Sequence, residues 1–410
     1  MQNLGGAVIH MLTNSNDIEF LVGDMTVLKK MQNVPVLPMF SQQAVDFLAA
    51  LSQALFKDER TKRNTDIMSY AYWIRRSSIE NIKKKHKDYK NRLGRGVAFH
   101  IAPSNVPVNF AVSMTSSVLA GNATLIKLSN KQFEQVDIIV EIMNDLLNHE
   151  FLFMRPYFCL IRYNHSDEIT QELSDICDVR IVWGGNGTVD AIRKAILPPR
   201  AVEMTFADRH SLAIINADVY LKSNPEEVAK WFYTDTYYTD QNACSSPRLI
   251  VWMGKQIEKA KLLFWDHLNK IVIKKYEMKP IQAVDKYASA CMLAMKQSGV
   301  RFNFDNNYVM RVEVNRLTKD LMQYKNGGGF FFEYDATDIS DILPILDKQC
   351  QTISVLGIDK KVVKDLIFSS GVKGGDRIVQ MGQTMGLEFI WDGYKMIEQM
   401  TRFVYTGEYE

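Results

Sequence analysis

The chain has 410 residues, of which 47% are hydrophobic and 23% are charged, and its formal net charge is +2. This composition is typical of a globular protein of about two to three domains, and it excludes general disorder. The near balance of charges gives no electrostatic reason to expect nucleic acid or an anionic membrane as the main partner.

The five cysteines lie far apart in the sequence and form no CxxC pair, which argues against a disulfide framework and against a zinc or other metal site. The N-terminus has no basic region, and its apolar run from Ala7 to Leu12 is too short for a signal peptide or a membrane span. We therefore expect a cytoplasmic protein in which a well-placed cysteine can act as a nucleophile.

Helical and β-rich segments alternate through the first half of the chain. One helix is predicted from Ser41, where apolar residues recur at three-and-four spacing, and another from about Thr65 to Arg92. From residue 97 strands and helices alternate, which favours right-handed crossovers and a mostly parallel sheet. The predicted strands are VAFHIA (97–102), ATLIKL (123–128), YFCLIRY (157–163) and VRIVW (179–183).

A second α/β block follows an interruption at residues 198–200. Its predicted strands are LAII (212–215), RLIVWM (248–253), YVMRVEV (308–314), FFFEY (330–334) and QTISVLG (351–357), with helices over about 225–240 and 256–276. The tail from 376 to 410 contains RIVQMG and a predicted last helix after WDG. Because no low-complexity linker separates the two blocks, we expect them to be packed together.

The sharpest candidate for chemistry is Cys244, in the segment QNACSSP between a predicted helix and a predicted strand. A thiol flanked by small polar residues has room for a substrate, and the nucleophilic thiolate is favoured near helix N-termini or cations. The alternative is a small residue that fills a turn. Of the other cysteines, Cys159 falls in an apolar strand pattern, and Cys177, Cys291 and Cys350 fall in helical patterns. All four are interpreted as structural packing residues.

Two further turns follow predicted strands. In APSNVPVN the prolines stiffen the loop and hold Asn105 at the carboxyl edge of the sheet, where open α/β folds bind ligands and an amide can donate to an oxyanion. In WGGNG, Gly184 and Gly185 precede a predicted helix and form a candidate phosphate cradle. The alternatives are a turn asparagine and a glycine-rich turn without a ligand.

In this order and spacing, the segments resemble the aldehyde dehydrogenase superfamily, and most of all its fatty acyl-CoA reductase branch, the LuxC-type reductases of bacterial bioluminescence operons. The resemblance covers about residues 94–400 and is carried by GRGVAFHIAPSNVPVNFA, LAGNATLIKLSNK, WGG, QNACSSPR, RIVQMG and WDGY. It implies an α/β fold of the aldehyde dehydrogenase type, with a Rossmann-type cofactor domain (96–205) packed on a catalytic α/β domain (206–375). An N-terminal helical region (1–95) would pack on the cofactor domain, and a C-terminal segment (376–410) would return to it.

The resemblance also implies roles for single residues. Cys244 would be the nucleophile that forms a thioester with the acyl group, and Asn105 and the backbone N–H of Cys244 would make the oxyanion hole. Lys127 and Ser129 match the segment that holds the adenosine ribose. Gly184 and Gly185 match the turn that faces the cofactor pyrophosphate.

Two departures from the superfamily pattern refine this expectation. Oxidising members carry a water-activating glutamate where Phe206 stands here, and the nearby Glu203 would point in a different direction on a strand. Without that base, the thioester is better matched to exchange with a thiol such as coenzyme A, as in an acylating or reductive enzyme. Asn130 and Lys131 stand where many NAD-preferring members carry a glutamate, which favours NADPH.

We therefore expect NADPH-dependent reduction of an acyl thioester, on coenzyme A or on a protein, to an aldehyde. The expected partners are an acyl-protein synthetase or acyl carrier, and a second copy of the chain in a homo-oligomer. His100 and His210 are considered as proton donors but favoured as structural residues, and Glu333 is assigned no role. The alternatives are an acyl-phosphate reductase, a non-redox cysteine acyltransferase and, from another class, a non-catalytic subunit of a complex.

Overall fold

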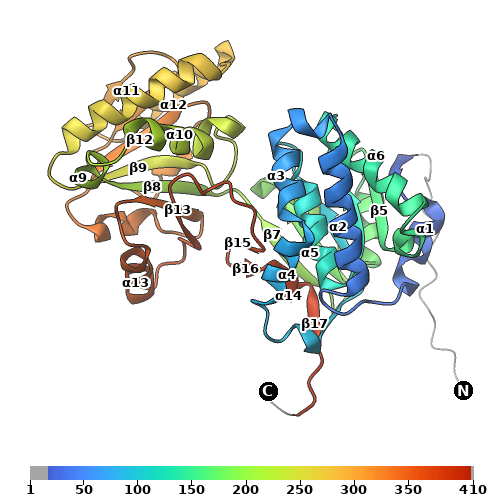
Figure 1. Cartoon of the computed structure of the whole chain (residues 1–410). Coiled ribbons are helices and arrows are strands. Elements are labelled where there is room, and N and C mark those ends of the chain that lie inside the picture. The colour runs from blue at the N-terminus through green and yellow to red at the C-terminus, as the bar shows by residue number, and fades with distance from the viewer. Residues whose placement is uncertain (1–16, 408–410) are drawn as a thin grey trace, which may run out of the picture. The chain divides into compact units, whose positions relative to one another are not determined.

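The structure is a computed structural model that describes residues 17–407. The run from Ala7 to Leu12 therefore lies outside the described residues. The described chain divides into two compact units (Figure 1). The first contains the residues up to Ala207, Leu387–Ile390 and the chain from Tyr394, and the second contains Asp208–Gly386 and Trp391–Gly393.

The first unit is built on a sheet with the strand order β1-β5-β4-β3-β6-β7. Its strands are β1 (Ile18–Val22), β3 (Val97–Ile101), β4 (Ala123–Lys127), β5 (Phe158–Tyr163), β6 (Val179–Trp183) and β7 (Val202–Phe206). All neighbours are parallel except β1, which is antiparallel to β5. The chain passes outwards from β3 through β4 to β5, then returns to β6 and β7 on the other side of β3. The topological switch point of this Rossmann-type sheet therefore lies between β3 and β6.

Helices with small and apolar residues cover this sheet. Helix α5 (Asn109–Ala120) contacts β3 and β4 and is itself contacted by α2 (Gln42–Lys57). Gly121 ends α5 at a φ of 89°, a left-handed conformation that favours glycine. The other elements of this unit are α1 (Met25–Lys30), α3 (Thr65–Trp73), α4 (Arg76–Lys83), α6 (Glu134–Asn148), α7 (Asp167–Asp175), α8 (Asn186–Ile192), α14 (Met396–Gln399) and the paired strands β2 (Arg92–Gly94) and β17 (Thr401–Phe403).

The predicted single helix from Thr65 to Arg92 is wrong, because the helix breaks between Trp73 and Arg76. At the break Arg75 has an extended backbone with ψ of 148°. The side chains of Arg75 and Ser78 both donate to the carbonyl of Tyr72, at 3.0 and 3.2 Å. These bonds satisfy the helix end locally and compete with continuation of the helix.

The second unit is built on a sheet with the order β10-β11-β12-β9-β8-β13-β14, parallel except for β10. Its strands are β8 (His210–Asn216), β9 (Pro247–Met253), β10 (Arg301–Asn303), β11 (Met310–Glu313), β12 (Phe330–Asp335), β13 (Cys350–Leu356) and β14 (Arg377–Gln380). Along β8, Leu212 and Ile214 enter one hydrophobic core, and Ala213 and Ile215 enter the core on the opposite face. The sheet is therefore buried on both faces, as parallel sheets are.

Helices flank both faces of this second sheet (Figure 1). They are α9 (Ala217–Tyr220), α10 (Pro225–Thr236), α11 (Ile257–Lys275), α12 (Pro280–Lys296) and α13 (Lys360–Ser370). The short strands β15 (Ile390–Trp391) and β16 (Tyr394–Lys395) form a separate hairpin. The sequence did not predict β1, β7 or α13. It placed Cys350 in a helix, which is wrong, because this residue begins β13.

Three of the cysteines interpreted as structural, Cys159, Cys177 and Cys350, are buried. Cys291 is exposed on α12, so its interpretation as a packing residue is wrong. The apolar residues Ile281, Val284 and Met295 share this exposure, and the helix contributes only part of its surface to the core.

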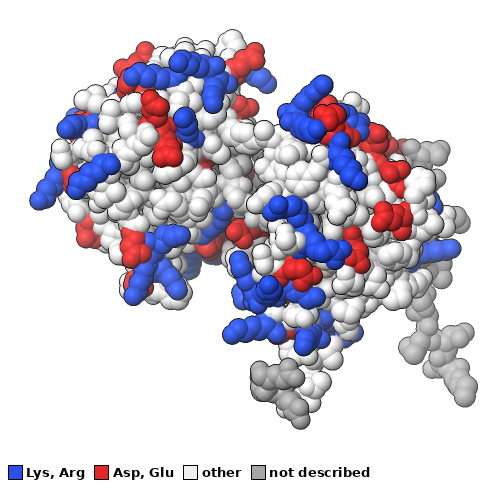
Figure 2. All heavy atoms as spheres, viewed as in Figure 1, with Lys and Arg blue, Asp and Glu red and all other residues white. Residues whose placement is uncertain are grey.

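Within residues 17–407, no helix is both long and apolar enough to cross a membrane. The same residues contain no group of three or more His, Cys, Asp and Glu side chains placed to hold a metal ion. Basic and acidic side chains are interspersed over the visible face of each unit (Figure 2).

Candidate active site

The candidate cofactor residues gather at one edge of the first sheet. Lys127 is the last residue of β4, Asn105 lies in the loop after β3, and Gly184 directly follows β6. Because β3 is parallel to both β4 and β6 and lies between them, the carboxyl ends of these strands meet at the same edge. This edge is also the topological switch point, where open α/β sheets bind nucleotides.

Lys127 is half-buried at this edge. Its ammonium group lies 5.0 Å from the centroid of the Tyr163 ring, and its backbone carbonyl accepts a hydrogen bond from the Ala102 N–H at 3.0 Å. Desolvation by the surrounding protein lowers the pKa of Lys127. A partly desolvated cation attracts an anionic or hydroxyl-bearing ligand more strongly than an exposed one.

The segment after Lys127 is held in place by side-chain contacts. The Ser129 carbonyl accepts a hydrogen bond from Arg162 at 3.2 Å, and its hydroxyl accepts one from the Lys131 N–H at 3.2 Å. Asn130 is exposed, and its amide donates to the Asn164 side chain at 3.0 Å. Asn130 and Lys131 therefore present neutral and cationic groups beside the segment that is expected to hold the ribose, without a carboxylate at either position.

The Gly184–Gly185 turn joins β6 to α8. A Cβ at Gly184 would lie 2.9 Å from the Thr188 Cβ, so glycine is needed there for the close approach of strand and helix. The Gly184 N–H donates to the Phe206 carbonyl at 3.2 Å, and Gly185 caps α8. With an ammonium, a hydroxyl, amides and a bare helix start at a switch point, these residues fit the phosphates and ribose of a dinucleotide.

Phe206, at the position where the resemblance predicts a water-activating glutamate in oxidising enzymes, lies in an aromatic stack. Its ring is 3.7 Å from that of Trp183 with an interplanar angle of 7°, and 5.6 Å from that of Tyr394. The Trp183 indole donates to Ser113, which also bonds His100 at 2.7 Å. Burial lowers the pKa of His100 to about 3, so this histidine is neutral at physiological pH.

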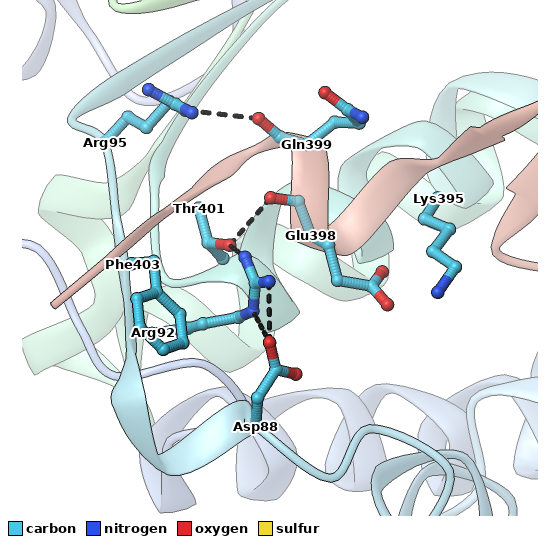
Figure 3. A pocket seen from close by; sticks show the side chains of 8 residues that line it. All are labelled: Asp88, Arg92, Arg95, Lys395, Glu398, Gln399, Thr401 and Phe403. Carbon is cyan, nitrogen blue, oxygen red and sulfur yellow. Dashed lines mark hydrogen bonds and ion pairs between the residues drawn. The ribbon is translucent and has the colours of Figure 1, made fainter. Parts of the chain in front are cut away.

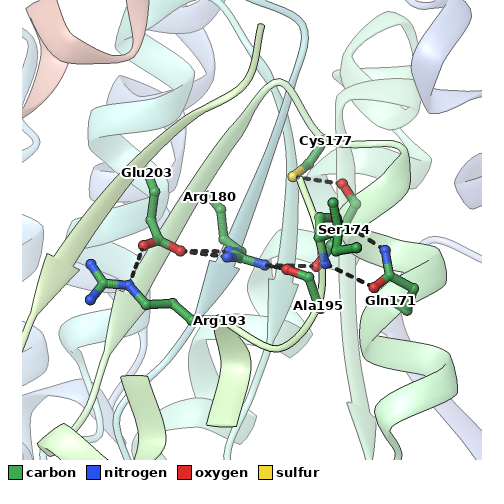
Figure 4. Close-up of polar contacts among 8 residues, drawn as sticks. Gln171, Ser174, Cys177, Arg180, Arg193, Ala195 and Glu203 are labelled. Carbon is green, nitrogen blue, oxygen red and sulfur yellow. Dashed lines mark hydrogen bonds and ion pairs between the residues drawn. The ribbon is translucent and has the colours of Figure 1, made fainter. Parts of the chain in front are cut away.

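Glu203 lies between two guanidinium groups (Figure 4). It accepts from buried Arg180 at 2.5 Å and from Arg193 at 2.7 Å. Arg180 also donates to Ser174 and to the Ala195 carbonyl, at 3.2 and 2.8 Å. Glu203 is thus committed to an ion-pair network that joins β6, β7 and α8, which explains its presence without a catalytic role.

Cys244 lies in the second unit, in the loop that connects the 3-10 helix η6 (Tyr237–Thr239) to β9. The residue is exposed, unlike Cys159, Cys177 and Cys350. Asp240 and Gln241 begin the loop with φ angles of 52° and 59°. The buried Gln241 amide donates to the carbonyls of Pro247 and Phe330, so the loop is tied to the amino ends of β9 and β12.

Cationic and anionic side chains meet around this loop. Desolvation by nearby protein atoms raises the pKa of the Cys244 thiol, although solvent still reaches part of the residue, and the negative charge of Asp392 raises it further. The Arg209 backbone N–H and the cations Lys325 and Arg248 act in the opposite direction. Cys244 is therefore a thiol at neutral pH in the free protein, with a proton to lose before attack.

Two other residues singled out in the sequence have structural surroundings. His210 is buried, and desolvation lowers its pKa to about 4, with the nearby Lys325 adding to the shift. Glu333 is buried on β12 and accepts hydrogen bonds from the indoles of Trp252 and Trp265, at 2.9 and 2.7 Å. His210 is therefore a neutral imidazole at physiological pH, and burial raises the pKa of Glu333.

A separate hollow of about 410 Å³ lies in the first unit beside β2, β17 and α14 (Figure 3). Three of its charged side chains are paired: Arg92 with Asp88 at 2.6 Å, and Glu398 with His86, outside the hollow, at 2.8 Å. Because β2 leads directly into the start of β3, the hollow lies toward the amino end of that strand, away from Asn105. It is distinct from the cofactor edge.

The structure thus brings Asn105 to the same sheet edge as the cofactor residues, and it places Cys244 in the other unit. An oxyanion hole made by Asn105 and the Cys244 N–H stays a prediction. Sequence reasoning missed Arg209, Lys325 and Asp392 near the thiol. Only Asp392 carried a signal, because it belongs to the WDGY motif that supports the family resemblance.

A profile of the acyl-CoA reductase (LuxC) family matches residues 20–403. The long-chain acyl-protein thioester reductase of Photorhabdus luminescens is 24% identical over 329 residues, which cover 78% of this chain and 65% of that protein. The corresponding reductase of Aliivibrio fischeri is 24% identical over 333 residues, with 77% and 65% covered. The chain thus spans slightly less than two thirds of the length of these relatives.

Among solved structures, lactaldehyde dehydrogenase from Escherichia coli is similar with a TM-score of 0.63 at 12% identity, over 92% of this chain and 88% of that one. This likeness confirms the predicted aldehyde dehydrogenase-like α/β fold. The family match extends over both units and includes the Asn105, Lys127, Gly184 and Cys244 segments. The chain belongs to the acyl-CoA reductase (LuxC) family.

Proposed function

We propose that the protein reduces an acyl thioester to an aldehyde, using NADPH and a covalent acyl-Cys244 intermediate. The observation that carries this proposal is the combination of an exposed thiol in a fixed loop with a dinucleotide-type sheet edge in one chain. Relatives described as long-chain acyl-protein thioester reductases support the thioester and the reductive direction.

In the acylation step, the Cys244 sulfur attacks the acyl carbonyl of the donor. A bond forms between sulfur and the acyl carbon, the bond to the donor sulfur breaks, and the proton lost by Cys244 is balanced by the proton gained by the leaving thiol. Asn105 and the Cys244 N–H donate to the developing oxyanion, worth about 3–4 kcal/mol per donor in comparable sites. Lys325 and Arg248 favour the thiolate that makes the attack.

Lys127, Ser129 and the Gly184–Gly185 turn would hold the ribose and phosphates of the cofactor. When bound, NADPH supplies the hydride that converts the acyl group to the aldehyde level. Asn130 and Lys131 place an amide and a cation where a carboxylate would repel a 2′-phosphate, which supports NADPH over NADH.

The groups around the two sites favour transfer to a thiol over hydrolysis. Phe206 is stacked on Trp183, and Glu203 is neutralised by Arg180 and Arg193, so neither is a free base for water. Coenzyme A or a carrier protein is the acyl donor that we propose. We also propose that the protein acts in the cytoplasm as a homo-oligomer, with an acyl-protein synthetase or acyl carrier as partner.

A second candidate, acyl-phosphate reduction, is favoured by a specific observation, the cations Lys325 and Arg248 near the thiol. Intact-mass analysis with a panel of acyl-CoA thioesters and the matching acyl phosphates, with and without NADPH, tests both. We expect an acyl adduct from the thioesters that disappears on adding NADPH while aldehyde forms. An adduct only from acyl phosphates would favour the second candidate, and no adduct from either would contradict the proposed mechanism.

A further inference from the structure

The tip of the β15–β16 hairpin is a two-residue Asp392-Gly393 turn. Both residues have positive φ angles, 50° and 77°, which is the conformation that such turns require and that Asp and Gly tolerate best. Trp391, just before the turn, lies 4.9 Å from the Arg377 guanidinium. The turn belongs to the second unit, the unit that contains Cys244.

The Asp392 carboxylate is held on two sides. Its side chain is 4% exposed, one oxygen accepts a hydrogen bond from the Gln351 amide at 2.6 Å, and the other lies 3.6 Å from the Arg209 guanidinium. Arg209 is shared with Asp376, which it contacts at 2.5 Å. Burial raises the pKa of Asp392 to about 6, so the group is charged above that pH.

Arg209 connects this carboxylate to the nucleophile. Its backbone N–H donates a hydrogen bond to the Cys244 sulfur, which lowers the pKa of the thiol. Its backbone carbonyl accepts a hydrogen bond from Lys325 at 3.1 Å. Next to it in the strand, the Ser211 hydroxyl donates to the Cys244 carbonyl at 2.7 Å. The positive charges of Lys325 and Arg248 thus lower the pKa of the Cys244 thiol, and the negative charge of Asp392 raises it.

We propose that Asp392 is a positioning residue for Cys244: it fixes Arg209 and opposes formation of the Cys244 thiolate in the free protein. The role follows from placement: a buried carboxylate in a tight turn binds Arg209, whose backbone N–H reaches the Cys244 sulfur. The proposal deepens the proposed function, since a restrained thiolate protects the nucleophile from alkylation and oxidation between turnovers.

The test measures the rate of iodoacetamide alkylation of Cys244 against pH, in a Cys291→Ser background that removes the other exposed cysteine. Asp392→Asn keeps a residue that tolerates positive φ and removes the charge. We expect the midpoint of the rate profile to move to lower pH by about 0.5–1 unit. Asp392→Glu, which retains the charge, should restore a midpoint close to that of the unsubstituted protein.

Asp376→Asn is the matched control, because it removes the other carboxylate bound to Arg209. We expect it to shift the midpoint by less than half as much. Circular dichroism checks folding, and Asp392→Gly, which is also free of strain at this φ, replaces Asp392→Asn if that variant does not fold. An unchanged midpoint, a shift to higher pH, or an equal shift in Asp376→Asn would overturn the proposal.

The alkylation profile requires no substrate, so its outcome is separate from that of the proposed function. A shifted midpoint together with the absence of any acyl adduct would retain the role of Asp392 and reject the reductase mechanism. An acyl adduct on Cys244 with an unchanged midpoint would do the reverse.

Discussion

The two candidate sites of this protein use opposite ends of parallel strands. In the first unit, Lys127 ends β4, and Asn105 and Gly184 follow β3 and β6, so all three lie at the carboxyl edge of the sheet. In the second unit, Cys244 and Arg209 precede β9 and β8, so they lie at the amino edge. The first arrangement follows the general rule for open α/β sheets, and the second does not.

This difference decides what a sequence can reveal. At this carboxyl edge, each candidate residue ends its own strand or lies in the loop after it, so a strand prediction also locates the residue. At the amino edge of the second sheet, the groups around the thiol come from segments far apart in sequence, such as Arg209, Lys325 and Asp392. Their meeting depends on the order of strands in the sheet.

The largest expected effect is at the amino edge, from Cys244→Ala. We expect this change to abolish the acyl adduct and aldehyde formation, because no other cysteine among the described residues lies in a comparable loop. Intact-mass analysis and an aldehyde assay measure both. Cys291→Ser is the matched control for an exposed cysteine and should retain full activity. Aldehyde production by Cys244→Ala would show that Cys244 is not the nucleophile.

At the carboxyl edge, Asn105→Ala should reduce kcat by about 100- to 1,000-fold, because it removes a donor used mainly in the transition state. NADPH binding, measured by fluorescence titration, should remain. Asn109→Ala, at the start of α5, is the control for a general disturbance of the loop. A loss of NADPH affinity with unchanged kcat would make Asn105 a cofactor ligand instead of an oxyanion donor.

The pH dependence of the free energy of unfolding tests whether His100, behind the first candidate site, is shielded from protons in the native state. The pKa of His100 is about 3 in the folded protein against 6.5 normally, so between these values the unfolded chain binds a proton that the native state does not. This contribution to stability is present above pH 6.5 and is lost as the pH falls. From pH 7 to 5 the protein should lose about 2 kcal/mol more stability than His100→Asn.

Urea unfolding of the two proteins at several pH values measures that difference. The same loss in both proteins would mean that His100 is accessible to protons in the native state, and that it remains a candidate proton donor.

The smallest expected effect concerns cofactor choice. Asn130→Glu should shift the ratio of kcat/KM for NADPH and NADH toward NADH by about tenfold, because a carboxylate repels the 2′-phosphate and accepts from a 2′-hydroxyl. Glu134→Gln, a charge change at the start of α6, is a control for general electrostatics. If the ratio does not change in Asn130→Glu, the 2′ position is recognised elsewhere.

Much of the fold could be predicted from the sequence. The strands around Phe99, Leu125 and Ile181 are short apolar runs separated by helical patterns, and each appears in the structure close to its predicted bounds. The predicted extent of the helix after Thr65 was wrong because the helix breaks at Arg75 without a proline or glycine. The break is stabilised instead by side-chain hydrogen bonds to the Tyr72 carbonyl. The role of the Asp392 turn was not predictable, since its partners Arg209 and Gln351 are distant in sequence.

The central claim is that Cys244 carries the acyl group. Peptide mapping of the protein after incubation with an acyl-CoA and no NADPH tests it most directly. The account predicts that the acyl label lies on the peptide containing Cys244, and that subsequent addition of NADPH removes it with release of aldehyde. A label on Cys291 or on any other cysteine, stable to NADPH, would contradict the assignment of the active site.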